Sequence, residues 1–206
     1  EKIAIIHNGI IENFLVIKRR LLAEGWTFAT DTDTEVIANL VSSYYAGDLA
    51  AAVKRAVGEL EGMYACALIG TESTLGDDEE IVAVRQGTPL VLGLGQGESF
   101  LASDPAALIA HTRDVIFLDN GDIARLTRSQ IEIWDRSGAA VKRPVTWHAR
   151  MRSSSITGVF EASDSTNPFS TISTIVGRCG RGSSSQTWLF MAKAWLRSCM
   201  IEEPSP

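Results

Sequence analysis

The sequence predicts an α+β fold, and two observations carry that prediction. Before Gly62, apolar side chains recur every three or four residues in three stretches, which is the spacing of amphipathic helices. After Gly62 the pattern changes to short apolar runs separated by glycines and by Asn120-Gly121. Helices followed by a strand-rich stretch are typical of α+β proteins with an antiparallel sheet.

The first elements follow from local signals. Residues 3–6 are wholly apolar, so we expect a strand that is buried on both faces. His7-Asn8-Gly9 comes next and is a turn signal. Residues 10–24 then place apolar side chains on one face and Lys and Arg on the other, which predicts a helix that ends at Gly25.

Two further helices and a series of strands complete the expected domain. Residues 26–30 are expected to be extended, Thr34 to cap a helix through residue 45, and Asp48 to cap a helix through residue 60. Asp104 and Pro105 predict a short helix over residues 105–111. The expected strands are residues 64–69, 81–85, 90–94, 99–102, 115–118, 122–127 and 131–135.

Composition excludes some classes of partner. The chain has 206 residues, a net charge of −6 and a pI near 5.1, so it has no surplus of Lys and Arg with which to bind nucleic acid. No apolar run approaches the ~20 residues that span a bilayer, and no basic-then-apolar leader is present. Three widely spaced cysteines show no metal-ligand spacing. We therefore expect a cytoplasmic protein that binds neither nucleic acid nor membrane.

The chain has two compositions. Residues 1–145 hold 13 basic and 21 acidic residues, whereas residues 146–206 hold 6 and 4. Serine supplies 12 of the last 61 residues but only 7 of the first 145. We expect one domain over residues 1–145 and an atypical tail over residues 146–206, loop-rich or disordered around residues 177–182 and with a short helix at residues 187–199.

Two motifs carry candidate chemistry. Asn8-Gly9 is commonly a structural turn, but a side-chain amide and the next peptide N–H at a strand end can also hold the oxyanion of an attacked amide. Residues 30–36, Thr-Asp-Thr-Asp-Thr-Glu-Val, are suited to a helix N-terminus, and a fixed carboxylate there could also pair with the ammonium group of an amino acid.

Taken together, these motifs resemble the class II glutamine amidotransferases. Further blocks are similar to one branch, the glutaminase domain of the glutamine:fructose-6-phosphate aminotransferases, also called glucosamine-6-phosphate synthases. The similar blocks are residues 5–13 (IIHNGIIEN), 31–37 (DTDTEVI), 87–95 (GTPLVLGLG), 102–108 (ASDPAAL) and 117–124 (FLDNGDIA).

The resemblance implies roles for three residues. Asn8, through its side chain, and Gly9, through its backbone N–H, match the oxyanion-hole pair. Asp33 matches the carboxylate that holds the α-amino group of L-glutamine. We assign no proton chemistry to His7, which we expect to support the turn.

The resemblance also implies an architecture and a reaction. The fold would be an incomplete four-layer α/β/β/α sandwich of the N-terminal-nucleophile hydrolase type. Ammonia released from glutamine would pass to fructose 6-phosphate, bound by sugar-isomerase domains, and give glucosamine 6-phosphate. No cofactor and no metal are implied, and the parent enzyme is expected to be a homo-oligomer.

The sequence also departs from the family pattern. The family's nucleophilic cysteine lies far upstream of the Asn-Gly motif, so the chain is expected to be a fragment, truncated at both ends and inactive alone as a glutaminase. Cys66 lies in an apolar strand, where a buried thiol is the ordinary expectation, and Cys179 and Cys199 lie beyond the resemblance, which ends near Arg143. One hypothesis is that the tail is translated out of frame.

Two alternatives stay open. One is the glutaminase domain of another class II amidotransferase, such as the enzyme that opens purine synthesis. The other is a non-catalytic remnant or interaction module that holds glutamine, or packs on a partner, without turning glutamine over.

Overall fold

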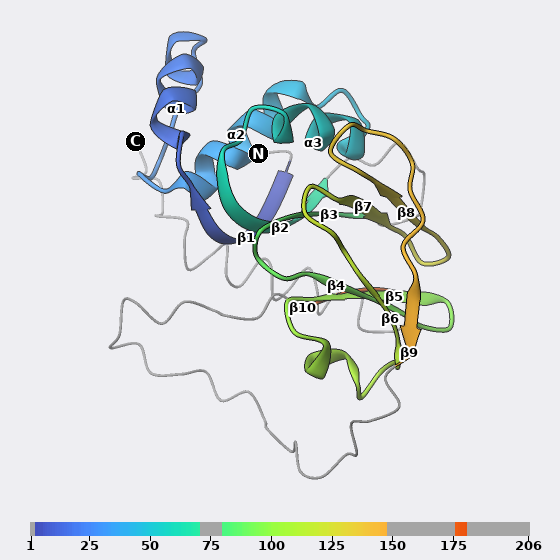
Figure 1. Ribbon diagram of the computed structural model, residues 1–206. Helices are drawn as coiled ribbons and strands as arrows, with labels where there is room; N and C mark the ends of the chain where they lie inside the picture. Colours follow the sequence, from blue (N-terminus) through green and yellow to red (C-terminus); the bar gives the residue numbers. More distant parts are fainter. Residues whose placement is uncertain (1–2, 71–79, 148–175, 181–206) are drawn as a thin grey trace, which may run out of the picture.

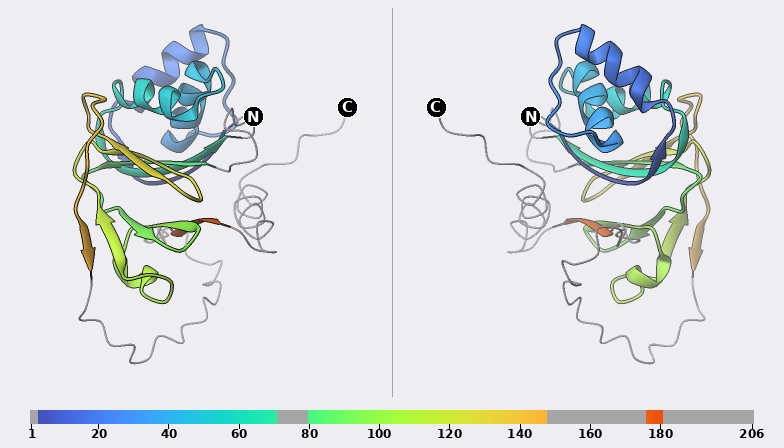
Figure 2. Two further views of the ribbon diagram at one scale, coloured as in Figure 1. Left: turned by 90° about the vertical axis from the view of Figure 1, so that its right-hand side faces the viewer. Right: turned by 90° about the vertical axis from the view of Figure 1, so that its left-hand side faces the viewer.

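The computed structural model describes residues 3–70, 80–147 and 176–180, and these form three layers (Figure 1). Three helices lie on one face of a five-stranded sheet, and a second five-stranded sheet lies against the other face (Figure 2). All strand pairs are antiparallel. The α+β prediction is confirmed, and the helix and two sheet layers are those expected of an incomplete four-layer sandwich.

The sheets interleave distant parts of the chain. The first sheet has the order β1-β2-β3-β7-β8, with strands Ile3–Ile11, Gly62–Gly70, Ile81–Gln86, Ile123–Leu126 and Ile131–Trp134. The second has the order β10-β5-β4-β6-β9, with strands Val176–Gly180, Glu98–Ala102, Val91–Leu94, Asp114–Phe117 and Val145–Trp147. The strands expected after Gly62 are therefore confirmed to within two residues at each end.

The helical layer consists of α1 (Phe14–Ala23), α2 (Asp33–Tyr44) and α3 (Leu49–Val57). The third helix forms as expected, because Asp48 accepts a hydrogen bond from the N–H of Ala51 at 3.0 Å and satisfies one of the unpaired donors of the first turn. One face of α3, formed by Leu49, Ala52, Val53, Ala56 and Val57, is buried.

The two sheets pack small residues against large ones. Along β2, alternate side chains face opposite layers, so Tyr64, Cys66 and Leu68 pack under the helices while Ala65 faces the second sheet. Ala83 and Ala124 of the first sheet also face the second sheet, which contributes Leu92, Leu101 and Ile116. The residues buried in this inter-sheet core are Ala65, Ala83, Leu90, Leu92, Leu101, Ile116, Leu118, Ala124, Leu126 and Ile133.

The turn expected at His7-Asn8-Gly9 is wrong. Strand β1 continues through Ile11, opposite β2, and α1 begins only at Phe14. Gly9 has a φ of +136°, and a Cβ there would lie 2.1 Å from the carbonyl oxygen of Met63. Glycine is thus required by the close approach of two paired strands and not by a turn.

The start of α1 is fixed by Asn13. Its side-chain amide donates to the carbonyl of Glu59 at 2.8 Å and accepts from the N–H of Glu61 at 3.1 Å. Glu59 also binds Arg20 of α1 and the hydroxyl of Tyr44. These contacts tie the first helix to the connection between α3 and β2.

Three other local expectations need correction. Helix α2 is capped by Thr32, not Thr34. The helix expected at 105–111 is a single 3-10 turn, η1 (Pro105–Leu108), in which Asp104 accepts from the N–H of Ala106. The run expected to be a loop at 177–182 contributes to β10, which pairs with β5. The helix expected at 187–199 lies outside the described residues.

Candidate functional site

Asn8 and Gly9 lie near the C-terminal end of β1, the edge strand of the first sheet. They stand opposite Ala65 and Tyr64 of β2. Asn8 is half-buried and Gly9 is exposed. The pair therefore borders solvent at a sheet edge while its backbone is held by β2.

Asp33, the first residue of α2, places its carboxylate beside that pair. One oxygen, Oδ2, accepts a hydrogen bond from the N–H of Ile11 at 3.0 Å. The other, Oδ1, lies 3.6 Å from Nδ1 of His7. His7 and Ile11 flank Asn8 and Gly9 on the strand, so Asp33 lies against the segment of β1 that carries this pair.

The Asp33 carboxylate keeps capacity for a further partner. A carboxylate offers about four lone-pair sites, and the N–H of Ile11 occupies one. The side chain is 23% exposed, so a ligand can reach it. A partly exposed acid held in place by a backbone donor is a suitable receptor for an ammonium group.

The rest of the acidic motif builds the helix start that presents Asp33. Thr32 caps α2 by accepting from the N–H of Glu35 at 3.4 Å. The Glu35 carboxylate accepts from the N–H groups of Ala29 and Thr30, each at 2.7 Å. Acidic residues in a first helical turn are also favoured by the helix dipole. Thr32 and Glu35 are thus structural, and they fix the position of Asp33.

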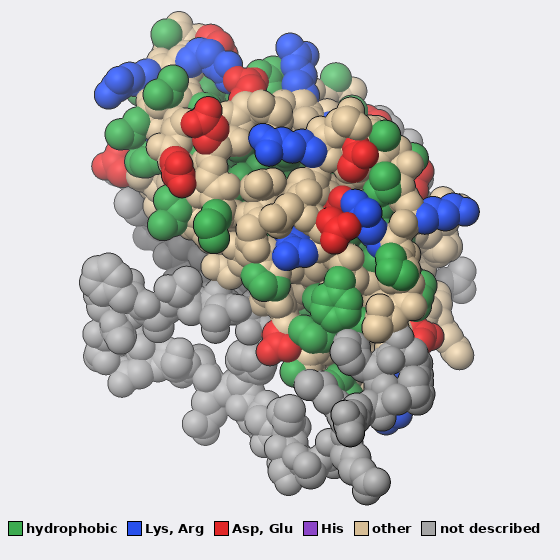
Figure 3. Space-filling model, viewed as in Figure 1, with side chains coloured by type: hydrophobic (Ala, Val, Ile, Leu, Met, Phe, Trp, Pro, Cys, Tyr) green, Lys and Arg blue, Asp and Glu red, His purple; other side chains and the backbone are tan. Residues whose placement is uncertain are grey.

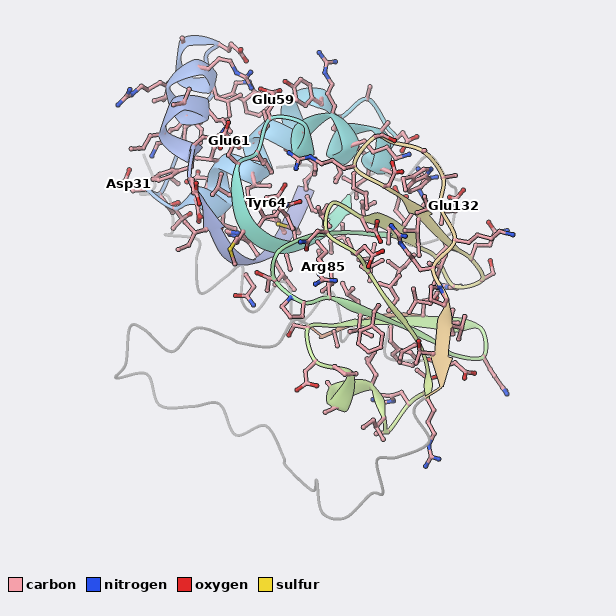
Figure 4. All side chains as sticks on the ribbon, viewed as in Figure 1. Asp31, Glu59, Glu61, Tyr64, Arg85 and Glu132 are labelled. Carbon is pink, nitrogen blue, oxygen red and sulfur yellow. The ribbon has the colours of Figure 1, made fainter. Side chains whose placement is uncertain are left out.

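Asp31, the other aspartate of the motif, has a different role. Its carboxylate binds Nζ of Lys18 at 2.8 Å, and its side chain points outward at the edge of the molecule (Figure 4). The hydrogen bond from Lys18 lowers the pKa of Asp31. Lys18 also donates to the carbonyl of Thr30 and lies over the ring of Phe28. Asp31 therefore anchors the loop to α1 and does not face β1.

His7 is a residue of the site that the sequence prediction missed. Its side chain is only 3% exposed, and its Nδ1 lies 3.0 Å from the hydroxyl of Thr34. Burial lowers the pKa of His7, and the nearby charge of Asp33 opposes that shift. The available signal was that a strand continuing past residue 6 would turn His7 toward the helical layer.

Cys66 lies directly opposite His7 on β2 and is buried, as expected. Burial, assisted by the negative charge of Asp33, raises the pKa of the thiol. The thiolate form is the nucleophile, so at neutral pH this cysteine is unreactive. Cys66 is a packing residue of the helical core.

The other motif blocks form scaffold on the far side of the sheet. The carboxylate of Asp122, which is 0% exposed, receives two hydrogen bonds from Arg143, at 2.8 and 2.7 Å. Asn120 accepts from the N–H of Gly87 at 3.0 Å, so the 87–95 and 117–124 blocks are in contact. Arg85 lies between the two sheets and donates to the carbonyl of Leu118 (Figure 4).

The helical layer presents no patch of like charge on the face seen in Figure 3. On the face seen in Figure 3, basic and acidic side chains are interspersed over the helical layer. Among the side chains that the structure describes, no three His, Cys, Asp or Glu groups lie together as metal ligands. In the same part of the chain, no helix combines the length and apolarity needed to cross a membrane.

Comparison with known proteins gives a family. A family model described as glutamine amidotransferase domain matches residues 1–110. A glutamine–fructose-6-phosphate aminotransferase (isomerizing) of Thermus thermophilus is 51% identical over 142 residues, which are 69% of this chain and 23% of that protein. Proteins of the same name are 42% identical in Methanosarcina mazei over 153 residues and 40% identical in Clostridium tetani over 150 residues. Those matches cover 70% and 71% of this chain and 24% of each protein, so the chain spans about a quarter of the length of these relatives.

Solved structures agree on the fold. The glutamine phosphoribosylpyrophosphate amidotransferase of B. subtilis, complexed with ADP and GMP, superposes with a TM-score of 0.57 at 23% identity, over 67% of this chain and 30% of that one. The structure of the allosteric regulatory enzyme of purine biosynthesis superposes with a TM-score of 0.53 at 23% identity. The match covers 65% of this chain and 28% of that one. The fold is of the N-terminal-nucleophile hydrolase type found in such amidotransferases. With the family match, these findings establish that this chain belongs to the glutamine amidotransferase domain family.

Proposed function

We propose that the β1–α2 junction binds L-glutamine, and that its residues act on the two ends of that molecule. Asp33 receives the α-ammonium group, and the side-chain amide of Asn8 with the N–H of Gly9 stabilises the oxyanion formed when the side-chain amide is attacked. The observation that carries the proposal is that the Asp33 carboxylate contacts β1 on both sides of Asn8-Gly9, at His7 and at Ile11.

The position of β1 supports the oxyanion role. Among the described strands, β1 pairs only with β2, so every second N–H group of β1 faces away from its neighbour. The N–H of Ile11 is one of these, because it reaches Asp33. Gly9 stands two residues earlier, and we expect its N–H on the same side. An oxyanion held there would lie near the ammonium receptor.

We further propose that the complete protein transfers ammonia from glutamine to fructose 6-phosphate and forms glucosamine 6-phosphate. Support comes from relatives of that name at 40–51% identity. The acceptor sugar would bind sugar-isomerase domains outside the matched region, in a homo-oligomeric, cytoplasmic enzyme. Residues 1–145 would form the glutaminase unit and residues 146–206 a separate segment.

A second candidate is a module that holds glutamine without hydrolysing it. One observation favours it: the thiol of Cys66 is buried and its pKa is raised. Glutamate release by this chain, measured beside the chain preceded by its native upstream sequence, separates the two functions. Hydrolysis by the extended form supports the amidotransferase, and binding without hydrolysis in both forms supports the module.

Calorimetric titration of L-glutamine into the purified chain tests the site itself. Replacing Asp33→Asn removes the charge with little change in shape, so we expect at least a tenfold loss of affinity, the change that about 1.4 kcal/mol represents. Asp31→Asn is the matched control, because that acid lies two residues away and faces Lys18. Equal affinities for the Asp33→Asn and Asp31→Asn variants would exclude the proposed ammonium site.

A further inference from the structure

His7 combines deep burial with contacts to the residues that present the ammonium receptor. Its ring lies between β1 and the first turn of α2, with Nδ1 3.0 Å from Oγ1 of Thr34 and 3.6 Å from Oδ1 of Asp33. Its side chain is 3% exposed. A group so enclosed does not touch a ligand that arrives from solvent, so any effect on glutamine must act through Asp33 or Thr34.

The second ring nitrogen gives an independent observation. Nε2 is buried and has no hydrogen-bond partner among the described residues. An unpaired buried polar atom is destabilising, and an apolar ring at this position would avoid that cost. The imidazole is therefore explained by what Nδ1 does.

The environment also favours one form of the ring. The Asp33 carboxylate near Nδ1 favours the tautomer that carries its proton on Nδ1, so that Nδ1 donates to Thr34 and Nε2 is left as an acceptor. Burial favours the neutral ring over the charged one. A neutral ring leaves the charge of Asp33 available to a ligand, whereas an imidazolium would compete for it.

We propose that His7 is a positioning residue for glutamine binding, which holds the first turn of α2 against β1 through Thr34 and so sets the Asp33 carboxylate beside Asn8-Gly9. This inference rests on the proposed function of Asp33 and adds a residue that does not itself contact the ligand. Asp33 has a second tether, the N–H of Ile11, so loss of the His7 contact weakens the placement without abolishing it.

A double-mutant cycle with L-glutamine as the titrant tests the proposal. We expect His7→Phe and Thr34→Val each to weaken binding roughly fivefold, the effect of losing one hydrogen bond of about 1 kcal/mol. Because both changes remove the same contact, the double variant should lose roughly fivefold as well, not the product of the two. His7→Asn, whose amide nitrogen can take the place of Nδ1, should bind within about twofold of wild type.

Asp48→Ala is the control for stability. It removes the N-terminal cap of α3 and an ion pair with Arg125, away from the junction, so we expect lower thermal stability with unchanged glutamine affinity. If His7→Phe folds poorly, the two single variants Thr34→Val and His7→Asn still test the proposal. The first should weaken glutamine binding and the second should preserve it.

The outcomes distinguish the positioning role of His7 from the ammonium-binding role of Asp33. Wild-type affinity in both His7→Phe and Thr34→Val, or strictly multiplicative losses in the double variant, would overturn the positioning role while the Asp33 assignment stands. An equal loss of affinity in Asp48→Ala would reduce His7 to a general stabiliser. Unchanged binding in Asp33→Asn would instead overturn the proposed function and this inference with it.

Discussion

The molecule contains two Asn-Gly pairs with an aspartate nearby, and the two aspartates lie in different environments. Asn8-Gly9 lies at a sheet edge beside Asp33, which is partly exposed and accepts one backbone hydrogen bond. Asn120-Gly121 precedes Asp122, which is fully buried and accepts hydrogen bonds from Nε and Nη2 of Arg143. The residue types are the same, and what differs is whether the carboxylate has capacity left. A saturated acid stabilises the fold, whereas an acid with unused lone pairs can bind a ligand.

Substitution of the two glycines should have the largest effect on the free energy of unfolding. A Cβ at Gly9 would lie 2.1 Å from a backbone carbonyl oxygen of β2, whereas at Gly121 the nearest atom is the Cβ of Arg136, at 2.8 Å. Both have positive φ, so both substitutions carry backbone strain. We expect Gly9→Ala to lower the free energy of unfolding by about 4 kcal/mol and Gly121→Ala by about 2 kcal/mol. Urea denaturation measures both free energies of unfolding. Equal losses in the two variants would contradict the close approach of the β1 and β2 backbones at Gly9.

Arg143 gives the next largest effect. Arg143→Ala leaves the buried Asp122 carboxylate without its counter-ion, and we expect a loss of about 3 kcal/mol in the free energy of unfolding. Arg113→Ala, at an exposed position, should change it by less than about 0.5 kcal/mol. Under conditions where both variants are folded, glutamine should bind them equally, because neither arginine contacts the β1–α2 junction.

The two aspartates should respond differently to loss of charge. Asp33→Asn should cost no more than about 1 kcal/mol of stability, because only the bond to Ile11 is weakened. Asp122→Asn, which faces a guanidinium in the interior, should cost about 3 kcal/mol. Chemical denaturation of the two variants in parallel checks the contrast. A larger loss for Asp33→Asn would mean that the junction is scaffold as well.

The smallest expected effect is the pH dependence contributed by His7. Burial lowers the pKa of His7 below its ordinary value of 6.5, so the unfolded chain binds this proton more readily than the folded chain. The contribution is fully present above pH 6.5 and is lost as the pH falls toward the folded-state pKa. Thermal unfolding from pH 7.5 to 5.5 should therefore show a steeper loss in wild type than in His7→Asn.

Much of the fold could be predicted because its signals are local. Helix α3 followed from a capping aspartate and a regular apolar face, and the strands after Gly62 followed from short apolar runs between turn residues. The first strand was predicted five residues too short, because Asn8-Gly9 is locally indistinguishable from a turn. Gly9 lies against the backbone of Met63, which is more than fifty positions away in the sequence. No local sequence pattern contains that contact.

The site could be predicted in part. Asn8, Gly9 and Asp33 follow from motif resemblance, and in the structure Asp33 contacts the residues of β1 on either side of Asn8-Gly9. The choice of cap among the three threonines of the acidic motif could not be made locally. Thr34 contacts His7 and Thr32 caps the helix. The role of His7 depends on that same contact between distant segments, so it was missed for the same reason.

The hydrogen bond between Asp33 and the N–H of Ile11 has a consequence for experiment. One carboxylate holds the strand amide and, in the proposed complex, the ligand, so occupancy should change the electron density that the amide proton experiences. The amide resonance of Ile11 would then act as a built-in, label-free reporter of ligand occupancy, readable by NMR without any catalytic turnover.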